Sequence, residues 1–217
     1  MIDDLNNPTN QLIHSISSWH RLKKVIAVFL RTKKILRDKI QARSSVNKEN
    51  LIANSHSNSL SAEDLAQAEI AIVKFIQLTT FHKEIMCLSN IKLEDSADYR
   101  KFQKSKKLTI KKVSSIHRLD PYLKDGILRV GGRLNRAELS PETAHPIILP
   151  YKNHVTTLII RHLHRQLGHV GRNHVIAAIR EKYWVIKVNA AFLVTYPNTP
   201  RSDGELLNGH NAERGLR

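Results

Sequence analysis

The chain has 217 residues, 41% of them hydrophobic, which is enough for one medium domain or two small ones. It carries 35 Lys and Arg against 19 Asp and Glu, a formal net charge of +16, which indicates a polyanionic partner such as nucleic acid rather than only a solvated surface. The single cysteine, Cys87, excludes an internal disulfide framework, and neither a signal peptide nor a membrane-spanning apolar run is recognisable. We therefore expect an intracellular chain, cytoplasmic or nuclear, that is neither secreted nor membrane-bound.

The first predicted element is a basic amphipathic helix. Apolar residues recur at steps of three and four, and only Lys33 interrupts the stripe. Between Arg21 and Arg43 there are nine Lys or Arg and one acid, Asp38, so the segment carries a charge of +8. Such a helix can follow a phosphate backbone, lie on a membrane surface or bind an acidic partner. The apolar stripe consists of Trp19, Leu22, Ile26, Phe29, Leu36 and Ile40.

A second helix is predicted after a connector at 44–60 that is rich in Ser and Asn. Ser61 followed by Asp64 fits a capping box, and an apolar face then runs towards Leu88. We expect this face to be core or to pack against the first helix. The following stretch, 91–118, is polar and strongly basic, which is typical of a solvated linker.

The segment "YLKDGILRVGGRL" predicts one small β-hairpin. Asp125 and Gly126 lie between short apolar stretches, and both central positions of such a turn need positive φ. Gly131 and Gly132 lack the spacing of a dinucleotide-binding loop and indicate a bulge or a strand end. The prolines in 145–150 predict an extended lead-in to the helices that follow.

Two short helices are predicted after this lead-in. The first ends at Gly168, a residue type that terminates helices, and the second ends with Tyr183 and Trp184, which we expect to anchor it on the first. Two short helices around a Gly-His-Val-Gly turn need a further stabilising element, and metal is the usual one at this size. The apolar faces are Val155, Leu158, Ile159 and His162 in the first helix, and Val175, Ile176, Ala178, Ile179 and Tyr183 in the second.

The histidines around this turn are the candidate metal ligands. His164 and His169 form H-x4-H, a separation that lets a helix end and the turn after it direct two rings at one ion. A structural zinc needs four Cys or His ligands, so the pair by itself fits two surface histidines more simply than half of a zinc site. His162 points to another side of the helix, and we expect it, His154 and His174 to be core, surface or edge residues.

The run "HPIILPYKNHVTTLIIRHLHRQLGHVGRNHVIAAIREKYWVIK" closely resembles the integrase zinc-binding domain of retrotransposon polyproteins of the Bel/Pao group. The preceding "LDPYLKDGILRVGGRLNRAELSPETAHPIILP" looks like the segment before that domain, and the upstream helices are similar to the connection between ribonuclease H and integrase. This resemblance covers residues 15–190. It implies that His164 and His169 are the first two ligands of a His-His-Cys-Cys zinc site. The family pattern continues after Phe192 to a C-x2-C pair that this chain lacks, so we expect zinc to be weak or absent.

The resemblance does not extend to the integrase catalytic domain, in which three carboxylates hold two metal ions. No nucleophile elbow or phosphate-binding loop is present either, so we expect no enzymatic activity, no catalytic residues and no small-molecule substrate. The expected function is nucleic-acid binding by a retrotransposon integrase fragment with an incomplete zinc-binding domain. The alternatives are a protein-interaction module for multimerisation and a translated transposon relic without function. The residues expected to bind DNA or RNA are Arg21, Lys23, Lys24, Lys33, Lys34, Arg37, Arg161, Arg165, Arg172 and Arg180.

The expected fold class is mainly α, with helical segments, one small β-hairpin, and a truncated helical His-His-Cys-Cys domain in the C-terminal part. In chain order we expect a disordered N-terminus (1–14), a basic helical region (15–118) and a hairpin with its extended lead-in (119–150). A partial zinc-binding domain (151–192) and an unrelated, disordered tail (193–217) complete the chain.

Overall fold

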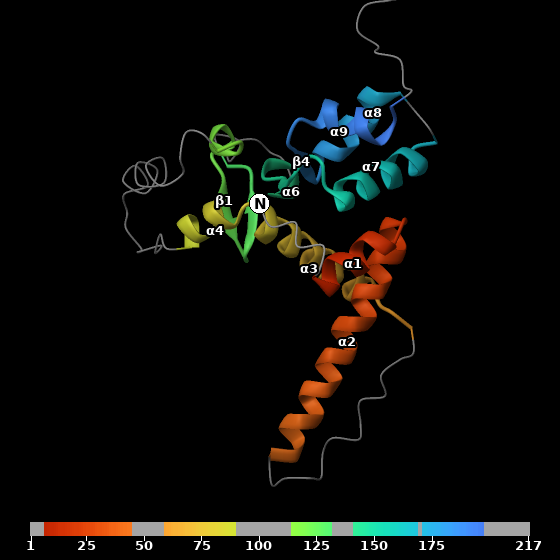
Figure 1. The fold of residues 1–217 in the computed structure, drawn as a ribbon, viewed down its shortest axis with the longest axis vertical. Coiled ribbons are helices and arrows are strands. Elements are labelled where there is room, and N and C mark those ends of the chain that lie inside the picture. The colour runs from red at the N-terminus through yellow and green to blue at the C-terminus, as the bar shows by residue number, and fades with distance from the viewer. Residues whose placement is uncertain (1–6, 45–58, 90–113, 132–140, 169–170, 198–217) are drawn as a thin grey trace, which may run out of the picture.

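The computed structural model describes residues 7–44, 59–89, 114–131, 141–168 and 171–197. In these ranges the protein is mainly helical, as predicted, with a small four-stranded sheet (Figure 1). None of the described helices combines the length and apolar character needed to cross a membrane. The helices are α1 (Pro8–Ser15), α2 (Trp19–Ser44), α3 (Ala62–Thr80), α4 (His82–Ser89), α6 (Pro141–Ala144), α7 (His154–Gln166), α8 (Arg172–Arg180) and α9 (Val188–Thr195), with a 3-10 turn at His117–Leu119. The strands are β1 (Tyr122–Lys124), β2 (Ile127–Arg129), β3 (Ile147–Leu149) and β4 (Tyr183–Val185).

The N-terminal stretch contains a capped helix where the structure describes it. Asn7 caps α1 with its side chain, and Pro8 occupies the first helical turn, where its missing N–H costs nothing. Ile13 is buried in the core, and α1 contacts α7. The prediction of disorder is therefore wrong for 7–14, because an apolar side chain of this short helix finds a buried site. The expectation for 1–6 lies outside the described residues.

The capping box predicted at the start of α3 is confirmed. The Ser61 Oγ accepts a hydrogen bond from the Asp64 backbone N–H at 3.1 Å, and the Asp64 carboxylate accepts one from the Ser61 N–H at 2.9 Å. The bond from Ser61 lowers the pKa of Asp64. The apolar face continues past α3, but the helix itself breaks at the buried Phe81, where α4 begins. The buried apolar residues of α3 are Ala68, Ile72, Val73 and Ile76.

The sheet has the order β1-β2-β3-β4. The predicted β1–β2 hairpin is confirmed, with φ of 52° at Asp125 and 75° at Gly126. The hairpin is part of a larger sheet than the one small hairpin predicted, because β3 pairs antiparallel with β2 and parallel with β4. Each strand has only three residues, too few to show a period in the sequence.

Both faces of this sheet are buried, because successive side chains of a strand point to opposite faces. In β3, Ile147 and Leu149 join a core shared with α1, α2, α3, α7, α8 and α9, whereas Ile148 joins a second core on the other face. The second core contains Ile116. The prediction of a solvated linker over 91–118 is therefore wrong for residues 114–118. The buried members of the second core are Phe81, Leu88, Ile116, Leu128, Val130 and Ile148.

The aromatic pair predicted to anchor a helix lies in a strand instead. Helix α8 ends at Arg180, and Tyr183 and Trp184 belong to β4, with one ring on each face of the sheet. The chain then forms α9, in which Phe192 is fully buried and Thr195 is 5% exposed. The boundary drawn between 192 and 193 is therefore wrong, because α9 continues across it, and the expectation of a disordered tail beyond residue 197 lies outside the described residues.

Gly131 follows β2 in close contact with the backbone, consistent with the predicted strand end. A Cβ added at this position would lie 2.1 Å from the backbone oxygen of Asp120, and the Gly131 N–H donates to the Leu119 carbonyl oxygen at 3.1 Å. We expect Gly131→Ala to lower the free energy of unfolding by about 2 kcal/mol, because the backbone must move to admit the methyl group. Chemical denaturation of Gly131→Ala and Gly171→Ala checks this, since nothing lies within 4 Å of a Cβ at Gly171. Equal stability of the two variants would contradict the prediction.

Candidate nucleic-acid interface

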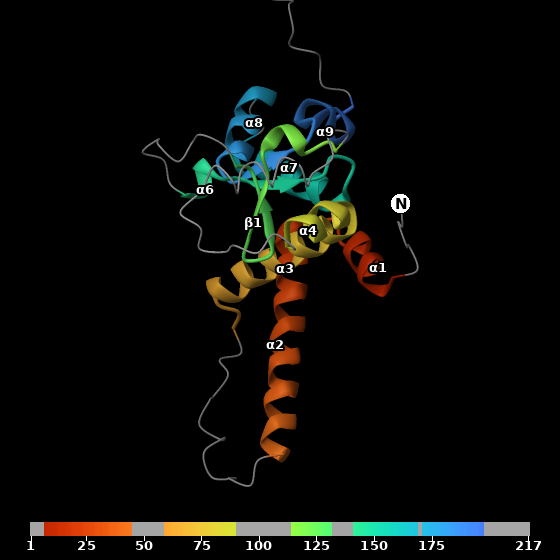
Figure 2. The ribbon, with the colours of Figure 1, turned by 90° about the vertical axis from the view of Figure 1, so that its left-hand side faces the viewer.

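Helix α2 projects from the rest of the described structure. Its N-terminal half packs on α3 and α7, with Trp19 3% exposed and Leu22 fully buried. Its C-terminal half extends away from the other elements in both ribbon views (Figures 1 and 2). Helix α3 begins beside the middle of α2, where Arg31 donates to the Ser59 carbonyl oxygen at 3.1 Å. The second half of α2 therefore presents side chains to solvent on several sides.

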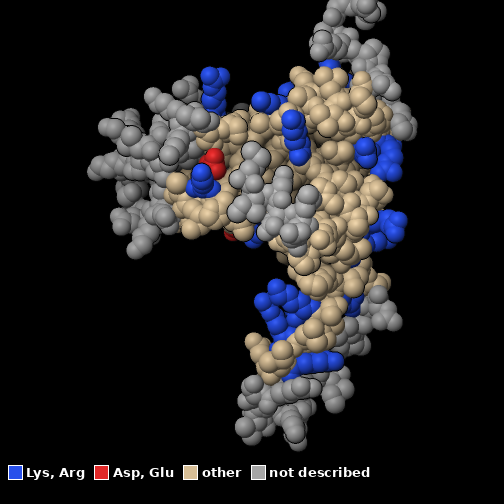
Figure 3. Space-filling model, viewed as in Figure 1, with Lys and Arg blue, Asp and Glu red and all other residues tan. Residues whose placement is uncertain are grey.

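Exposed cations surround this projecting helix. Of the residues predicted to bind nucleic acid, Arg21, Lys24, Lys33, Lys34 and Arg37 are all exposed. At 3.6 residues per turn these positions do not share one face, so the cations of the predicted basic amphipathic helix are not confined to one side of it. Lys39, which was not among the predicted residues, is exposed as well. Figure 3 shows the Lys and Arg side chains along the projecting part of the molecule.

Lys23 differs from the other cations of α2. Its ammonium nitrogen lies 3.3 Å from the Glu69 carboxylate and 5.5 Å from the centre of the Trp19 ring. The side chain is 18% exposed. We therefore assign Lys23 to the packing of α2 on α3, in place of the phosphate contact predicted for it.

The other predicted cations lie on α7 and α8. Arg161 and Arg165 are exposed on α7, where the Arg165 Nε donates to the Arg161 carbonyl oxygen at 3.3 Å. On α8, Arg172 is half-buried, whereas Arg180 is exposed with its guanidinium carbon 5.8 Å from the centre of the Trp184 ring. These four residues belong to the globular part of the structure and not to the projecting half of α2.

The predicted apolar stripe of α2 divides into a buried and an exposed half. Trp19 and Leu22 are buried, but Phe29 is 64%, Leu36 54% and Ile40 63% exposed. Val25 and Val28 are also exposed, at 40% and 53%. Helix α3 packs on the N-terminal part of α2, as expected for one of the two roles of its apolar face, and the C-terminal part of the α2 stripe stays exposed.

His164, the first candidate zinc ligand, lies in an aromatic cluster between α7 and α9. Its ring centre is 4.7 Å from that of Tyr196 and 6.2 Å from that of Phe192, and the two aromatic rings are 5.2 Å apart. The second candidate, His169, lies outside the described residues. This cluster packs α9 against α7 at the position where the resemblance implies a metal.

The described residues contain no group of three or more His, Cys, Asp or Glu side chains that could hold a metal ion. The only cysteine of the chain, Cys87, is half-buried on α4. A four-ligand zinc site with two thiolates therefore does not fit the donors of this chain.

The remaining histidines that were considered as metal ligands have separate environments. Burial lowers the pKa of His162, and the positive charges of Lys23 and Arg165 add to this effect. The His154 Nε2 lies 2.8 Å from the Ile16 carbonyl oxygen, so this ring links α7 to the loop after α1. His174 is exposed on α8, in agreement with the expectation of a surface position.

Comparison with known proteins identifies no family for this chain. No protein-family model, curated protein or solved structure matches the chain.

Two polar side chains that organise the structure were missed in the sequence. Gln77 is fully buried and bonded to β2 and β3, and Glu69 is 8% exposed and bonded to α2, Lys182 and β4. Each stands within the predicted apolar region of α3, and that interruption of the pattern is a signal that could have identified them.

Proposed function

We propose that this chain derives from the integrase region of a Bel/Pao-type retrotransposon polyprotein and binds nucleic acid without catalysing a reaction. The observation that carries this proposal is the projecting half of α2, which combines a high density of exposed cations with a single acid, Asp38. A charged rod of this kind suits the phosphate backbone, because its cations can release condensed counterions without reading bases. The overall excess of Lys and Arg supports the same partner.

Neutralising the exposed cations of α2 should weaken binding to all sequences alike. We expect the variant Lys24→Gln/Lys33→Gln/Lys34→Gln/Arg37→Gln to lose duplex affinity and to flatten the salt dependence of binding. Each lost phosphate contact should reduce the slope of log K against log salt by about 0.9. Fluorescence anisotropy with two unrelated duplexes at several salt concentrations measures both quantities.

The matched control removes four exposed charges from other elements. The variant Lys74→Gln/Lys83→Gln/Arg118→Gln/Lys124→Gln has the same net charge as the α2 variant, and all four positions are exposed. A general charge effect would lower the duplex affinity of the two variants equally. Equal salt slopes for the wild type and the α2 variant would refute the role of this helix.

A second candidate function is self-association through the exposed apolar residues of α2. The observation in its favour is the exposure of Phe29, Leu36 and Ile40, of which Leu36 and Ile40 lie in the projecting half. Since each copy carries a charge of +8 between Arg21 and Arg43, association should strengthen as salt screens the repulsion, whereas nucleic-acid binding should weaken. Sedimentation equilibrium of Phe29→Ser/Leu36→Ser/Ile40→Ser against Leu78→Ser, another exposed leucine, tests this candidate.

We further propose that zinc binding is weak. Two histidines without the thiolate pair should not provide the roughly 10–16 kcal/mol with which a complete structural site drives folding. Adding zinc should leave the circular dichroism spectrum unchanged, and competition with a chromophoric chelator should show low affinity. Tight one-to-one binding that His164→Ala abolishes, together with a gain of helix, would show that other residues complete the site.

A further inference from the structure

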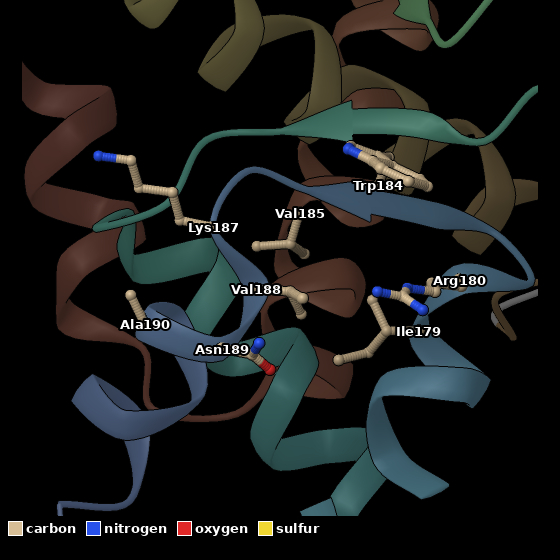
Figure 4. A pocket seen from close by; sticks show the side chains of 8 residues that line it. All are labelled: Ile179, Arg180, Trp184, Val185, Lys187, Val188, Asn189 and Ala190. Carbon is tan, nitrogen blue, oxygen red and sulfur yellow. The ribbon is translucent and has the colours of Figure 1, made fainter. Parts of the chain in front are cut away.

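An open pocket lies where α8, β4 and α9 meet, on the side of the molecule away from the projecting half of α2. Its volume is about 410 Å³, within the range of small-molecule and cofactor pockets. Ile179, Val185 and Val188 form an apolar floor, with Trp184 at one side (Figure 4). The pocket is therefore suited to a flat, largely apolar group.

Two cations stand on opposite sides of this floor. Figure 4 shows the Arg180 side chain on the side of Trp184 and the Lys187 side chain on the other, with the valines between them. The Arg180 guanidinium carbon lies 5.8 Å from the centre of the Trp184 ring, within the range of a cation–π interaction. None of the described residues that line the pocket is acidic.

A third cation adjoins the pocket on the Lys187 side. The ammonium nitrogens of Lys152 and Lys187 lie 5.4 and 5.6 Å from the centre of the same Tyr151 ring. These lysines follow the parallel strands β3 and β4, and both have left-handed backbone, with φ of 59° and 51°. Two lysines in a conformation that disfavours non-glycine residues are thus held at one aromatic ring.

We propose that this pocket holds one unpaired nucleotide of a single-stranded nucleic acid. The base lies on the apolar floor and stacks on the guanidinium of Arg180, while the phosphates on its two sides contact Arg180 and the Lys152–Lys187 pair. Stacking on aromatic or guanidinium planes combined with cations along the backbone is the usual chemistry of single-strand recognition. A paired base is stacked inside a duplex and cannot enter. The inference rests on the proposed function and assigns single strands to this pocket and duplex affinity to α2.

Tryptophan fluorescence tests occupancy of the pocket in the unaltered chain. The chain has two tryptophans, Trp19 and Trp184. Because Trp19 is only 3% exposed, a change in emission on adding a ligand reports on Trp184. Oligothymidylate should quench the emission to saturation, and a duplex of equal length should not. Trp184→Phe should remove the quenching. Unchanged emission of the wild type would overturn the proposal, whatever the variants do.

Two pocket variants distinguish the effect of blocking the pocket from the effect of removing its cations. Ala190→Phe fills the pocket without removing a cation, and Arg180→Gln/Lys187→Asn removes two cations while using an asparagine that tolerates the left-handed backbone. Both should weaken oligothymidylate binding at least about tenfold more than the charge-matched control Lys83→Gln/Lys124→Gln. Duplex affinity should change no more than in that control.

The outcomes distinguish the pocket from the proposed function. If the pocket variants weaken single-strand and duplex binding equally, or behave like the control, the pocket is not a nucleotide site. If they lose only the single strand while the α2 variant keeps full duplex affinity, the pocket proposal stands and the proposed role of α2 fails.

Discussion

Replacing Gln77 with Leu should lower the free energy of unfolding by about 3–5 kcal/mol, although the side chain is fully buried and the new residue is apolar and similar in size. The Gln77 amide nitrogen donates to the carbonyl oxygens of Leu128 at 2.9 Å and Ile148 at 2.7 Å, and its oxygen accepts from the Leu128 N–H at 2.8 Å. Leucine would leave these three buried backbone groups without that partner. Each such group costs about 1–3 kcal/mol, and partial relaxation makes the sum smaller than three full penalties.

The position of this amide explains the size of the effect. Strands β2 and β3 pair at Arg129 and Ile147, and the next residues in that register are Leu128 and Ile148. The Gln77 amide bonds to both of these residues and so bridges the strands where their pairing ends. It ties α3 to both β2 and β3 at one point.

Chemical denaturation and hydrogen exchange check this prediction together. Gln77→Leu should shift the unfolding midpoint strongly and reduce protection of the Leu128 amide, whose acceptor is lost. Gln67→Leu is the matched control. Gln67 lies on the same helix, and its side-chain amide is exposed and donates to the Glu63 carboxylate. A stability change in Gln77→Leu as small as in Gln67→Leu would mean that the strands close on each other once the amide is gone.

The sequence predicted those elements that depend on interactions between residues close together in the chain. The capping box at Ser61 and Asp64, the turn at Asp125 and Gly126, and the helix end at Gly168 all follow from hydrogen bonds or φ values within a few residues. Gly168 has a φ of 73°, as its place after α7 requires.

The sheet and its bridge depend on long-range contacts that no local pattern contains. Gln77 is separated by 51 and 71 residues from its partners Leu128 and Ile148. Tyr183 and Trp184 continue the apolar period of α8, so the sequence predicts a helical anchor, and only pairing with β3 makes them a strand.

The candidate interface was predictable in its charge but not in its exposure. Counting Lys and Arg identifies the segment that contains α2. The exposure of Leu36 and the pairing of Lys23 with Glu69 both depend on where α3 crosses, which is a tertiary property. The pocket beside Trp184 was not predicted, because its cations come from the ends of β3, α8 and β4.

The second large effect concerns Glu69, which connects three parts of the fold. One carboxylate oxygen lies 3.3 Å from the Lys23 ammonium on α2, and the other lies 2.5 Å from the Lys182 ammonium and accepts a 2.5 Å hydrogen bond from the Tyr183 hydroxyl. Burial alone would raise the pKa of Glu69, but the hydrogen bonds from Lys182 and Tyr183 and the charges of both lysines lower it below the ordinary value.

We expect Glu69→Gln to lower the free energy of unfolding by about 2–3 kcal/mol near neutral pH. The amide keeps the shape of the side chain but removes the charge that Lys23 and Lys182 face, and hydrogen bonds to charged groups contribute about 1.5–3 kcal/mol. The effect is smaller than for a fully buried pair, because the Lys182 side chain is 44% exposed. Glu63→Gln on the same helix is the control, since the exposed Glu63 carboxylate bonds only the exposed Gln67 amide among the described contacts.

The pH dependence of this difference identifies the carboxylate as its cause. The folded pKa of Glu69 lies below the ordinary value of 4.5, so its contribution is fully present above about pH 4.5 and is lost as the pH falls through the folded pKa. The stability gap between the wild type and Glu69→Gln should therefore stay constant from about pH 7 to about pH 5 and shrink on further acidification, because the protonated wild-type side chain resembles glutamine. Urea denaturation of both proteins across this range measures the gap. A gap that stays constant below the folded pKa would show that the amide of the variant disturbs the packing, and that the charge of Glu69 does not hold α2, α3 and β4 together.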